Sequence, residues 1–255
     1  MNGLYSCIIA ISMYSKIPMP NVEWTEERMR YVMCFFPLVG IVQGAALGLW
    51  LHLALDVLNL SVGAAALTGA AIPLLVTGGI HMDGFLDTCD ARASWEDREK
   101  KLQILKDTHT GAFAVIGGGL YLLLYCGGCS ELPARGAAAV SAGFILSRAL
   151  SGLAAAVFPG AREHGMLADF MKDSRRRLVA ASMVFCMAAS AGLMVLLGGL
   201  LGAASLFGAL LAFFYYRRMV FREFGGVTGD LAGYFLQLCE LFMVLAAAVC
   251  HGILS

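Results

Sequence analysis

The chain is organised around one stretch, which reads Thr77-Gly78-Gly79-Ile80-His81-Met82-Asp83-Gly84-Phe85-Leu86-Asp87-Thr88-Cys89-Asp90. A charged run over residues 92–101 follows, and the stretch closes on Leu105-Lys106-Asp107-Thr108-His109-Thr110-Gly111. Long apolar segments lie on both sides of it. Carboxylates between membrane-type segments are costly unless water or a partner such as a metal ion accompanies them. The stretch therefore predicts a polar site at the edge of a membrane.

The composition is typical of a polytopic membrane protein. Of the 255 residues, 59% are hydrophobic and 14% are charged, whereas soluble domains carry about a quarter charged residues. Thirty glycines without a short repeat fit closely packed transmembrane helices. The formal net charge is zero, so electrostatics give no support to nucleic-acid binding. We expect one integral membrane domain over residues 1–255.

The apolar segments predict an all-α bundle of about six to seven transmembrane helices. They run over residues 31–55, 62–79, 112–125, 137–158, 178–216 and 231–254. As one helix, residues 178–216 would be ~58 Å long, against a hydrocarbon core of about 30 Å, so they predict a hairpin that turns at 198–202. Residues 4–14 are too short to cross comfortably, which predicts a short or re-entrant N-terminal helix.

The basic residues predict the orientation of the bundle. Of the 18 lysines and arginines, all but Arg135 and Arg148 lie in the N-terminal segment or in the polar loops that join the predicted hairpins. The positive-inside rule places those loops in the cytoplasm. We therefore expect a multi-pass protein of the cell's inner or plasma membrane, with its active site on the cytoplasmic side, where nucleotides and magnesium are available.

Asp83, Asp87 and Asp90 are spaced i, i+4, i+7, so on a helix they share one stripe. Three carboxylates there repel one another unless a cation lies between them. Oxygen ligands suit Mg²⁺, Mn²⁺ or Ca²⁺, and Mg²⁺ commonly uses one or two carboxylates with substrate phosphate. The alternative is a solvated acidic helix end. Three glycines favour the metal site, since they weaken a helix and allow a ligand close to the backbone: Gly78, Gly79 and Gly84.

Polar residues around the stripe have both functional and purely structural interpretations. His81 lies off the stripe; it could bind a substrate phosphate, orient a carboxylate, or simply sit at the membrane boundary. Lys106, Asp107 and His109 form either an interfacial charge cluster or a lid that adds a cation and a carboxylate to the site.

A second polar group lies near the C-terminus. Asp230 follows Thr228-Gly229, and its spacing to Glu240 is compatible with one helix face. Glu240 falls deep in a predicted span, where an unpaired carboxylate is costly. Arg148, within another span, is a natural partner for it. A structural pair and a contact of Arg148 with substrate phosphate both remain open.

The run from Gly78 to Asp90 resembles the G-G-h-H-x-D-G-h-x-D-T-x-D signature (h, apolar) of the cobalamin synthase family, the adenosylcobinamide-GDP ribazoletransferases. Further matches follow in order along nearly the whole chain. They are Lys16-Ile17-Pro18-Met19-Pro20, Phe36-Pro37-Leu38-Val39-Gly40, the run from Leu105 to Gly111, Ser147-Arg148, Ala161-Arg162-Glu163-His164-Gly165 and Gly225-Gly226-Val227-Thr228-Gly229-Asp230. Each match is weak alone, and the ordered set is specific.

The resemblance implies a Mg²⁺-dependent transfer of adenosylcobinamide phosphate from adenosylcobinamide-GDP to α-ribazole or its 5′-phosphate, with release of GMP. It implies metal binding by Asp83, Asp87 and Asp90, and catalysis by these three with Asp107 and His81. The implied substrate-binding residues are Gly78, Gly79, Gly84, Lys106, His109, Arg148, Thr228, Gly229, Asp230 and Glu240. The residues do not choose the general base and do not fix an oligomeric state.

Two competing interpretations use the same residues. Another membrane phosphotransferase, acting on CDP-alcohols or polyprenyl phosphates, would also need clustered aspartates at a helix end. A cation transporter could use Asp83, Asp87, Arg148 and Glu240 as its path.

Overall fold

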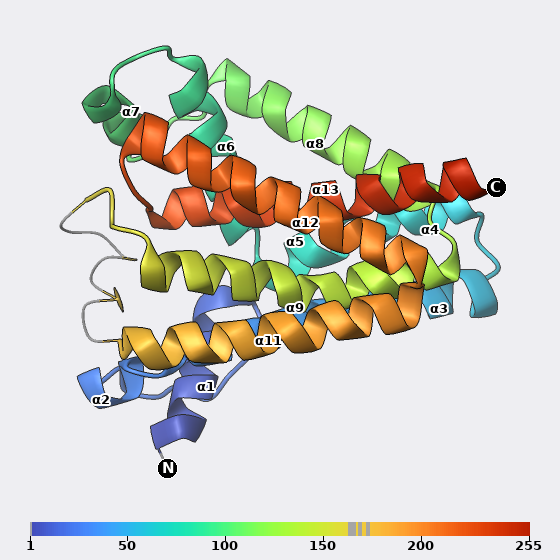
Figure 1. Ribbon diagram of the computed structural model, residues 1–255, viewed down its shortest axis with the longest axis horizontal. Coiled ribbons are helices and arrows are strands. Elements are labelled where there is room, and N and C mark those ends of the chain that lie inside the picture. Colours follow the sequence, from blue (N-terminus) through green and yellow to red (C-terminus); the bar gives the residue numbers. More distant parts are fainter. Residues whose placement is uncertain (1, 163–166, 168–169, 172–173) are drawn as a thin grey trace.

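The computed structural model describes residues 2–162, 167, 170–171 and 174–255. Over this part of the chain the structure is helical, and its one β feature is an isolated bridge between Gly160 and Val227. The predicted all-α class is therefore confirmed (Figure 1). Of the family-like run at 161–165, Glu163, His164 and Gly165 lie outside the described residues.

Within the described part of the chain, six helical segments are long and apolar enough to cross a membrane. Two of them include a short irregular turn of helix: η1 (Val32–Phe35) and η2 (Leu53–Val57) flank α3, and η3 (Val220–Phe224) extends α12. A bent pair of helices would make a seventh span, which agrees with the six to seven predicted. The six are built on α3 (Phe36–His52), α8 (Ala112–Ser130), α9 (Ala134–Val157), α11 (Arg176–Gly198), α12 (Leu200–Met219) and α13 (Gly229–Leu254).

The bent pair corrects one expectation, since residues 62–79 do not form a single span. α4 (Val62–Gly69) ends before α5 (Ile72–Thr77), which begins with Pro73 in its first turn; proline has no N–H to continue the preceding helix. The chain then turns by 98° into α6 (Ile80–Ala93). Gly78 and Gly79 make this corner, with φ of 64° and 79°, values that glycine adopts without the steric cost other residues incur.

The hairpin and the short N-terminal helix are as predicted. α11 and α12 are joined at Gly199, whose φ is 58°. α1 (Asn2–Tyr14) has 13 residues and is therefore ~20 Å long, too short for a hydrocarbon core of about 30 Å. Two further short helices, α2 (Glu26–Met29) and α7 (Arg98–Ile104), lie in the polar segments.

α9 lies inside the bundle and packs against α3, α11, α12 and α13. Its contact with α3 is backbone to backbone. A Cβ placed on Gly40 would lie 2.3 Å from the carbonyl oxygen of Phe144, and one on Gly44 equally close to that of Ser141. Small residues four apart allow this approach between membrane helices.

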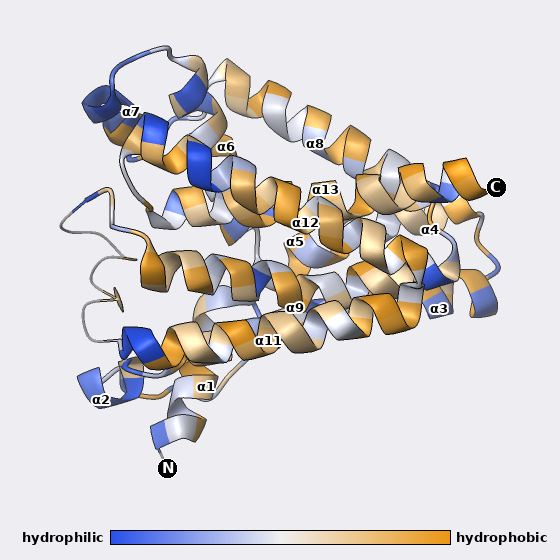
Figure 2. Cartoon of the chain, viewed as in Figure 1, coloured by the Kyte–Doolittle hydropathy of each residue, from blue (hydrophilic) through white to orange (hydrophobic). Residues whose placement is uncertain are grey.

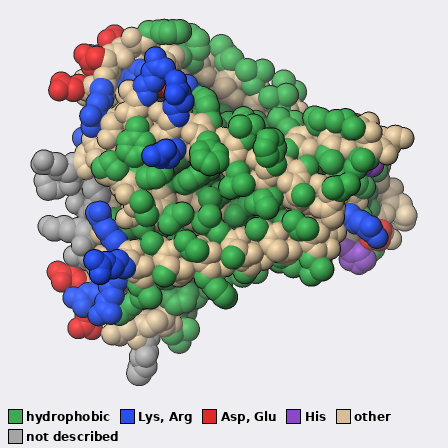
Figure 3. Space-filling view, viewed as in Figure 1, with side chains coloured by type: hydrophobic (Ala, Val, Ile, Leu, Met, Phe, Trp, Pro, Cys, Tyr) green, Lys and Arg blue, Asp and Glu red, His purple; other side chains and the backbone are tan. Residues whose placement is uncertain are grey.

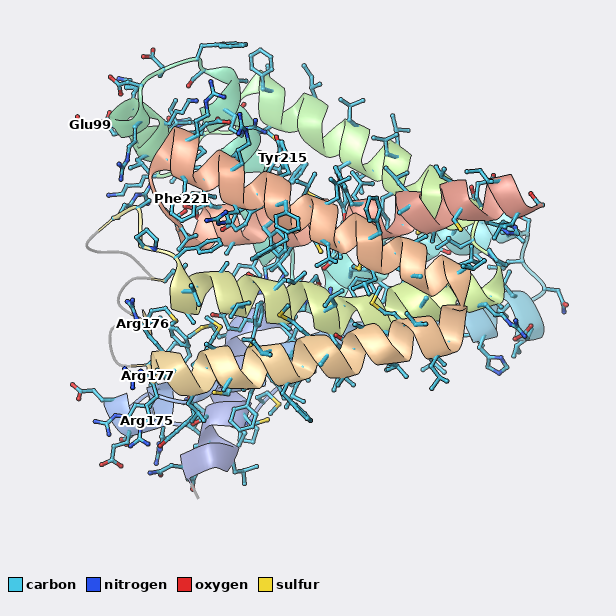
Figure 4. The ribbon with its side chains drawn as sticks, viewed as in Figure 1. Glu99, Arg175, Arg176, Arg177, Tyr215 and Phe221 are labelled. Carbon is cyan, nitrogen blue, oxygen red and sulfur yellow. The ribbon has the colours of Figure 1, made fainter. Side chains whose placement is uncertain are left out.

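The polar segments gather at one end of the bundle. Figure 2 shows hydrophilic residues at α2, α7 and the start of α11, and mostly apolar residues along the long helices. Figure 3 shows charged side chains gathered at the same end, with hydrophobic side chains covering the length of the bundle. Figure 4 places Glu99 of α7 and Arg175, Arg176 and Arg177 at this same end. The expected grouping of the basic loops on one side is confirmed, and their cytoplasmic location stays a prediction.

Replacing Gly40 with alanine should destabilise the protein by about 1–3 kcal/mol, because the added methyl collides with the α9 backbone. Gly48 is the matched control: it lies on the same helix, and a Cβ there meets nothing within 4 Å. Thermal unfolding in detergent should show a lower Tm for Gly40→Ala and an unchanged or higher Tm for Gly48→Ala. Equal effects of the two changes would contradict the α3–α9 contact.

Candidate active site

A cavity of about 290 Å³ opens at the polar end of the bundle. It lies among α1, η1, the start of α3, the start of α6, the second half of α9 and the start of α13. The polar side chains of its lining come from segments far apart in the sequence. They are His81, Asp83, Ser151, Arg162, Thr228 and Asp230.

Asp83 and Asp230 reach the same cavity because α6 and α13 touch through their backbones. A Cβ on Gly84 would lie 2.6 Å from the carbonyl oxygen of Asp230, and one on Gly233 would lie 2.9 Å from that of His81. Only glycine fits at these two positions without a shift. The structure thus gives Gly84 a packing function, and its assignment to substrate binding stays a prediction.

The remaining glycines of the predicted site differ from one another. The Lys16 side chain covers Gly78, so that a Cβ there would lie 2.3 Å from the Lys16 Cε atom. Gly79 has nothing within 4 Å of such a Cβ, and Gly229 lines the cavity. Thr228 caps α13 by accepting a hydrogen bond from the Leu231 N–H at 3.2 Å. Of this group, only Thr228 and Gly229 stand in the cavity lining.

Asp83, Asp87 and Asp90 all lie on α6, so the predicted helical stripe is confirmed. α6 lies outside the six candidate spans. The pKa of Asp87 is raised to about 6 by desolvation and then by the charges of Asp83, Asp230, Asp90 and Asp107. The pKa shift reflects several negative charges close together, and a bound cation would reduce their repulsion.

Asp90 also performs a structural task that its spacing does not reveal. Its carboxylate accepts the Gly111 N–H at 2.6 Å and the Ala114 N–H at 2.8 Å. These are two of the free N–H groups at the start of α8, which a carboxylate stabilises. A Cβ on Gly111 would lie 2.6 Å from a carboxylate oxygen of Asp90. Asp90 therefore holds the end of the 105–111 loop against α6.

The carboxylates suit a metal ion that is bound jointly by the protein and the substrate better than one bound by protein side chains alone. Among the described residues, no group of three or more histidine, cysteine, aspartate or glutamate side chains is arranged to hold a metal ion alone. The negative crowding around Asp87 suits an ion that takes one or two carboxylates and completes its shell with phosphate oxygens, as Mg²⁺ does. The assignment of Asp83, Asp87 and Asp90 as metal ligands stays a prediction.

His81 is a buried residue at the start of α6. Only 5% of the residue is exposed, and its ring lies 6.4 Å from that of Tyr14 and 6.0 Å from that of Phe36, centroid to centroid. Burial, and then the charge of Arg148, hold the pKa of His81 well below its ordinary value. Neither ring nitrogen has a hydrogen-bond partner among the described residues. The imidazole lines the cavity, and both of its nitrogens are enclosed by neighbouring atoms.

Arg148 and Glu240 form an ion pair with both side chains fully buried. Arg148 Nη1 donates to Glu240 Oε1, and also to Ser147 Oγ at 2.8 Å and to the Phe144 carbonyl at 3.3 Å. Neither member of the pair lines the cavity. The buried ion pair is therefore confirmed, and the assignment of these two residues to substrate binding stays a prediction.

Comparison with known proteins agrees with this geometry. A family model described as cobalamin-5-phosphate synthase matches residues 6–248. The chain belongs to this family. The resemblance drawn from the sequence motifs is thereby confirmed, and family membership argues against the lipid-phosphotransferase and transporter interpretations. The protein is a transferase of cobalamin biosynthesis.

Curated relatives match the chain over nearly its full length, and those that follow are named adenosylcobinamide-GDP ribazoletransferase. A protein of Lachnoclostridium phytofermentans is 43% identical over 254 residues, which cover 100% of this chain and 97% of the relative. One of Desulfitobacterium hafniense is 34% identical over 94% of each chain. One of Clostridium botulinum is 30% identical over 95% of this chain and 96% of its own. No solved structure is significantly similar to the chain.

The family-like loop at 105–111 lies beside the cavity. Leu105 lines it, whereas Lys106, Asp107 and His109 are exposed. The Asp107 carboxylate accepts the backbone N–H of His109 at 3.0 Å and lies 2.7 Å from His109 Nδ1. Hydrogen bonding to His109 lowers the pKa of Asp107. The lid function of this loop stays a prediction.

Sequence reasoning missed a charged cluster beside α6 in this family member. Arg92 binds Glu223 through Nε at 3.2 Å and Nη2 at 3.1 Å, and its Nη1 donates to the hydroxyls of Tyr215 and Tyr234 at 2.6 and 3.0 Å. Lys101 Nζ donates to Glu223 at 3.2 Å. The cluster ties α6 and α7 to the ends of α12 and α13. The one available signal was Glu223, a single acid within a basic run.

Replacing Glu240 with leucine should cost about 3–5 kcal/mol, because it leaves the buried charge of Arg148 without its partner. The double change Arg148→Met with Glu240→Leu removes both charges and should recover much of that loss. Thermal unfolding of the wild type, both single variants and the double variant measures the coupling. A double variant less stable than the Glu240→Leu variant would contradict a purely structural pair.

Proposed function

We propose that the protein is an adenosylcobinamide-GDP ribazoletransferase. A hydroxyl of α-ribazole, or of its 5′-phosphate, attacks the phosphorus that carries cobinamide. A new P–O bond forms to the nucleoside, the P–O bond to the bridging oxygen breaks, and GMP leaves with that oxygen. The supporting observation is that two family-like runs, 78–90 and 225–230, supply Asp83 and Asp230 to one cavity.

Displacement at a diphosphate requires charge neutralisation, in-line positioning and a base for the hydroxyl. Asp83 and Asp87 would hold Mg²⁺ together with substrate phosphates, with Asp90 as the third predicted ligand. Bound there, Mg²⁺ would neutralise the diphosphate. Lys106, His109 and His81 are proposed phosphate contacts, and Asp107 or a carboxylate of the α6 stripe takes the proton.

The proposed orientation places the cavity on the cytoplasmic side of the inner or plasma membrane. It is supported by the gathering of basic loops at the end of the bundle where the cavity opens and by the positive-inside rule. Both nucleotide substrates and Mg²⁺ would then reach the site without crossing the bilayer.

Asp83→Asn should abolish GMP release from adenosylcobinamide-GDP and α-ribazole, because the cavity loses a proposed metal ligand, while the amount and Tm of membrane-inserted protein stay unchanged. Asp56→Asn is the control, since Asp56 is exposed, pairs with His52, and lies at the far end of α3 from the cavity. Wild-type turnover by the Asp83 variant would contradict the assignment.

Removing divalent metal should stop the reaction. Membranes treated with EDTA should release no GMP, and added Mg²⁺ should restore release, because the crowded carboxylates and the diphosphate otherwise repel each other. The protein's Tm should change little, since Mg²⁺ is proposed to bind with the substrate. Full activity in EDTA would contradict a metal-dependent site.

A further inference from the structure

The cavity described above has an apolar part that the proposed metal and phosphate chemistry does not use. It is built mainly on α1, η1 and the start of α3, away from the carboxylates of α6. Its side chains include Met13, Tyr14, Met33, Phe36, Phe170 and Leu236. A site that served only a diphosphate and a metal ion would have no need of this surface.

Aromatic rings form the part of this surface that lies beside His81. Tyr14 and Phe36 contact each other, with ring centroids 4.4 Å apart, and both lie beside the ring of His81. His81 is 95% buried, lines the cavity, and has two ring nitrogens without partners among the described residues. Both nitrogens are enclosed by neighbouring atoms, so His81 adds to this part of the cavity as a third ring rather than as a hydrogen-bonding group.

The size of the cavity limits what it can enclose. Pockets for drug-sized ligands are typically about 300–1,000 Å³, and this cavity, at about 290 Å³, lies at the lower limit. It suits one small planar ligand. A corrinoid together with its nucleotide would have to lie at the mouth.

Two nucleoside bases take part in the proposed reaction, and the lining distinguishes them. Guanine presents O6 and N7 acceptors and an N2 donor on its edges. The aromatic part of the lining, made by Tyr14, Phe36 and the ring of His81, leaves these groups mostly unpaired at a cost in free energy. A base with an apolar edge leaves no hydrogen-bonding group unpaired there, and it gains stacking on the aromatic rings.

We propose that this cavity is the subsite for the nucleoside acceptor, with a planar, largely apolar base held against Tyr14 and Phe36, next to the ring of His81. The ribose then points toward Asp83. The inference rests on the proposed function and adds to it which substrate occupies the cavity and which residues select it.

The test uses the full-length protein in detergent or nanodiscs, with α-ribazole as the probe. Calorimetric titration measures its binding without corrinoid, and steady-state kinetics measure KM for each substrate separately. Tyr14→Leu and Phe36→Leu remove a ring and keep apolar volume. Tyr14→Phe keeps the ring, and Phe113→Leu changes an exposed ring on α8 that does not line the cavity.

Each ring-removing change should weaken α-ribazole binding and raise its KM by at least about five-fold, with KM for adenosylcobinamide-GDP within about two-fold of wild type. Tyr14→Phe and Phe113→Leu should stay within about two-fold for both substrates. The Tm of each variant identifies any that fail to fold. If one ring-removing variant does not fold, the test uses the other.

Three results are decisive. Unchanged α-ribazole binding in ring variants that fold would overturn the inference. If the wild type still turns over, the proposed function is unaffected by that result. Weakened binding of GMP, with a raised KM for adenosylcobinamide-GDP alone, would assign the cavity to guanosine and also overturn it. Absence of any turnover by the wild type with Mg²⁺ would instead overturn the proposed function, and the inference with it.

Discussion

The structure depends on one close contact, the crossing of α6 and α13 at Gly84 and Gly233. At this crossing the backbone of each helix rests on the other, since a Cβ on either glycine would come within 3 Å of a carbonyl oxygen opposite. The contact joins residues almost 150 positions apart and brings Asp83 and Asp230 to one cavity. The corner at Gly78 and Gly79 makes this possible, because it turns α6 by 98° away from α5. Without that turn, the carboxylate stripe would continue the direction of an apolar helix.

The electrostatics of the cavity follow from this crossing. Asp83, Asp87 and Asp230 are brought close enough that their charges act on one another, and Arg162 is the one lysine or arginine among the described residues of the lining. A diphosphate entering alone would meet net repulsion. A site of this kind therefore works with a cation that arrives with its ligand, which explains why no closed metal site needs to be built into the described residues. The local charge pattern and the proposed phosphoryl chemistry thus require the same partner, a divalent cation.

Local periodicity and segment length predicted much of the fold: the number of spans, the α11–α12 hairpin, the short α1 and the helical stripe of α6. They also pointed to the Arg148–Glu240 pair, because a charge deep in a span needs a partner. Contacts between distant segments could not be predicted in this way. The capping of α8 by Asp90, the binding of Glu223 by Arg92 and Lys101, and the aromatic contact of Tyr14 with Phe36 arise from tertiary packing, which leaves no period in the sequence. Pro73 lies at the break before α5, but the uniformly apolar residues around it have the pattern of a continuous span.

The position of α1 explains why a helix too short to cross a membrane belongs to the site. The chain leaving α1 is fixed to the corner before α6: the Lys16 N–H donates to the Val76 carbonyl at 2.8 Å, and the Lys16 side chain lies over Gly78. Tyr14, two residues earlier, stands on the aromatic side of the cavity, and His81, three residues after Gly78, stands beside it. The corner therefore sets the distance between the aromatic surface and the carboxylates of α6. A longer, membrane-spanning first helix would have its position set by the bilayer, whereas this short one takes its position from the residues that line the site.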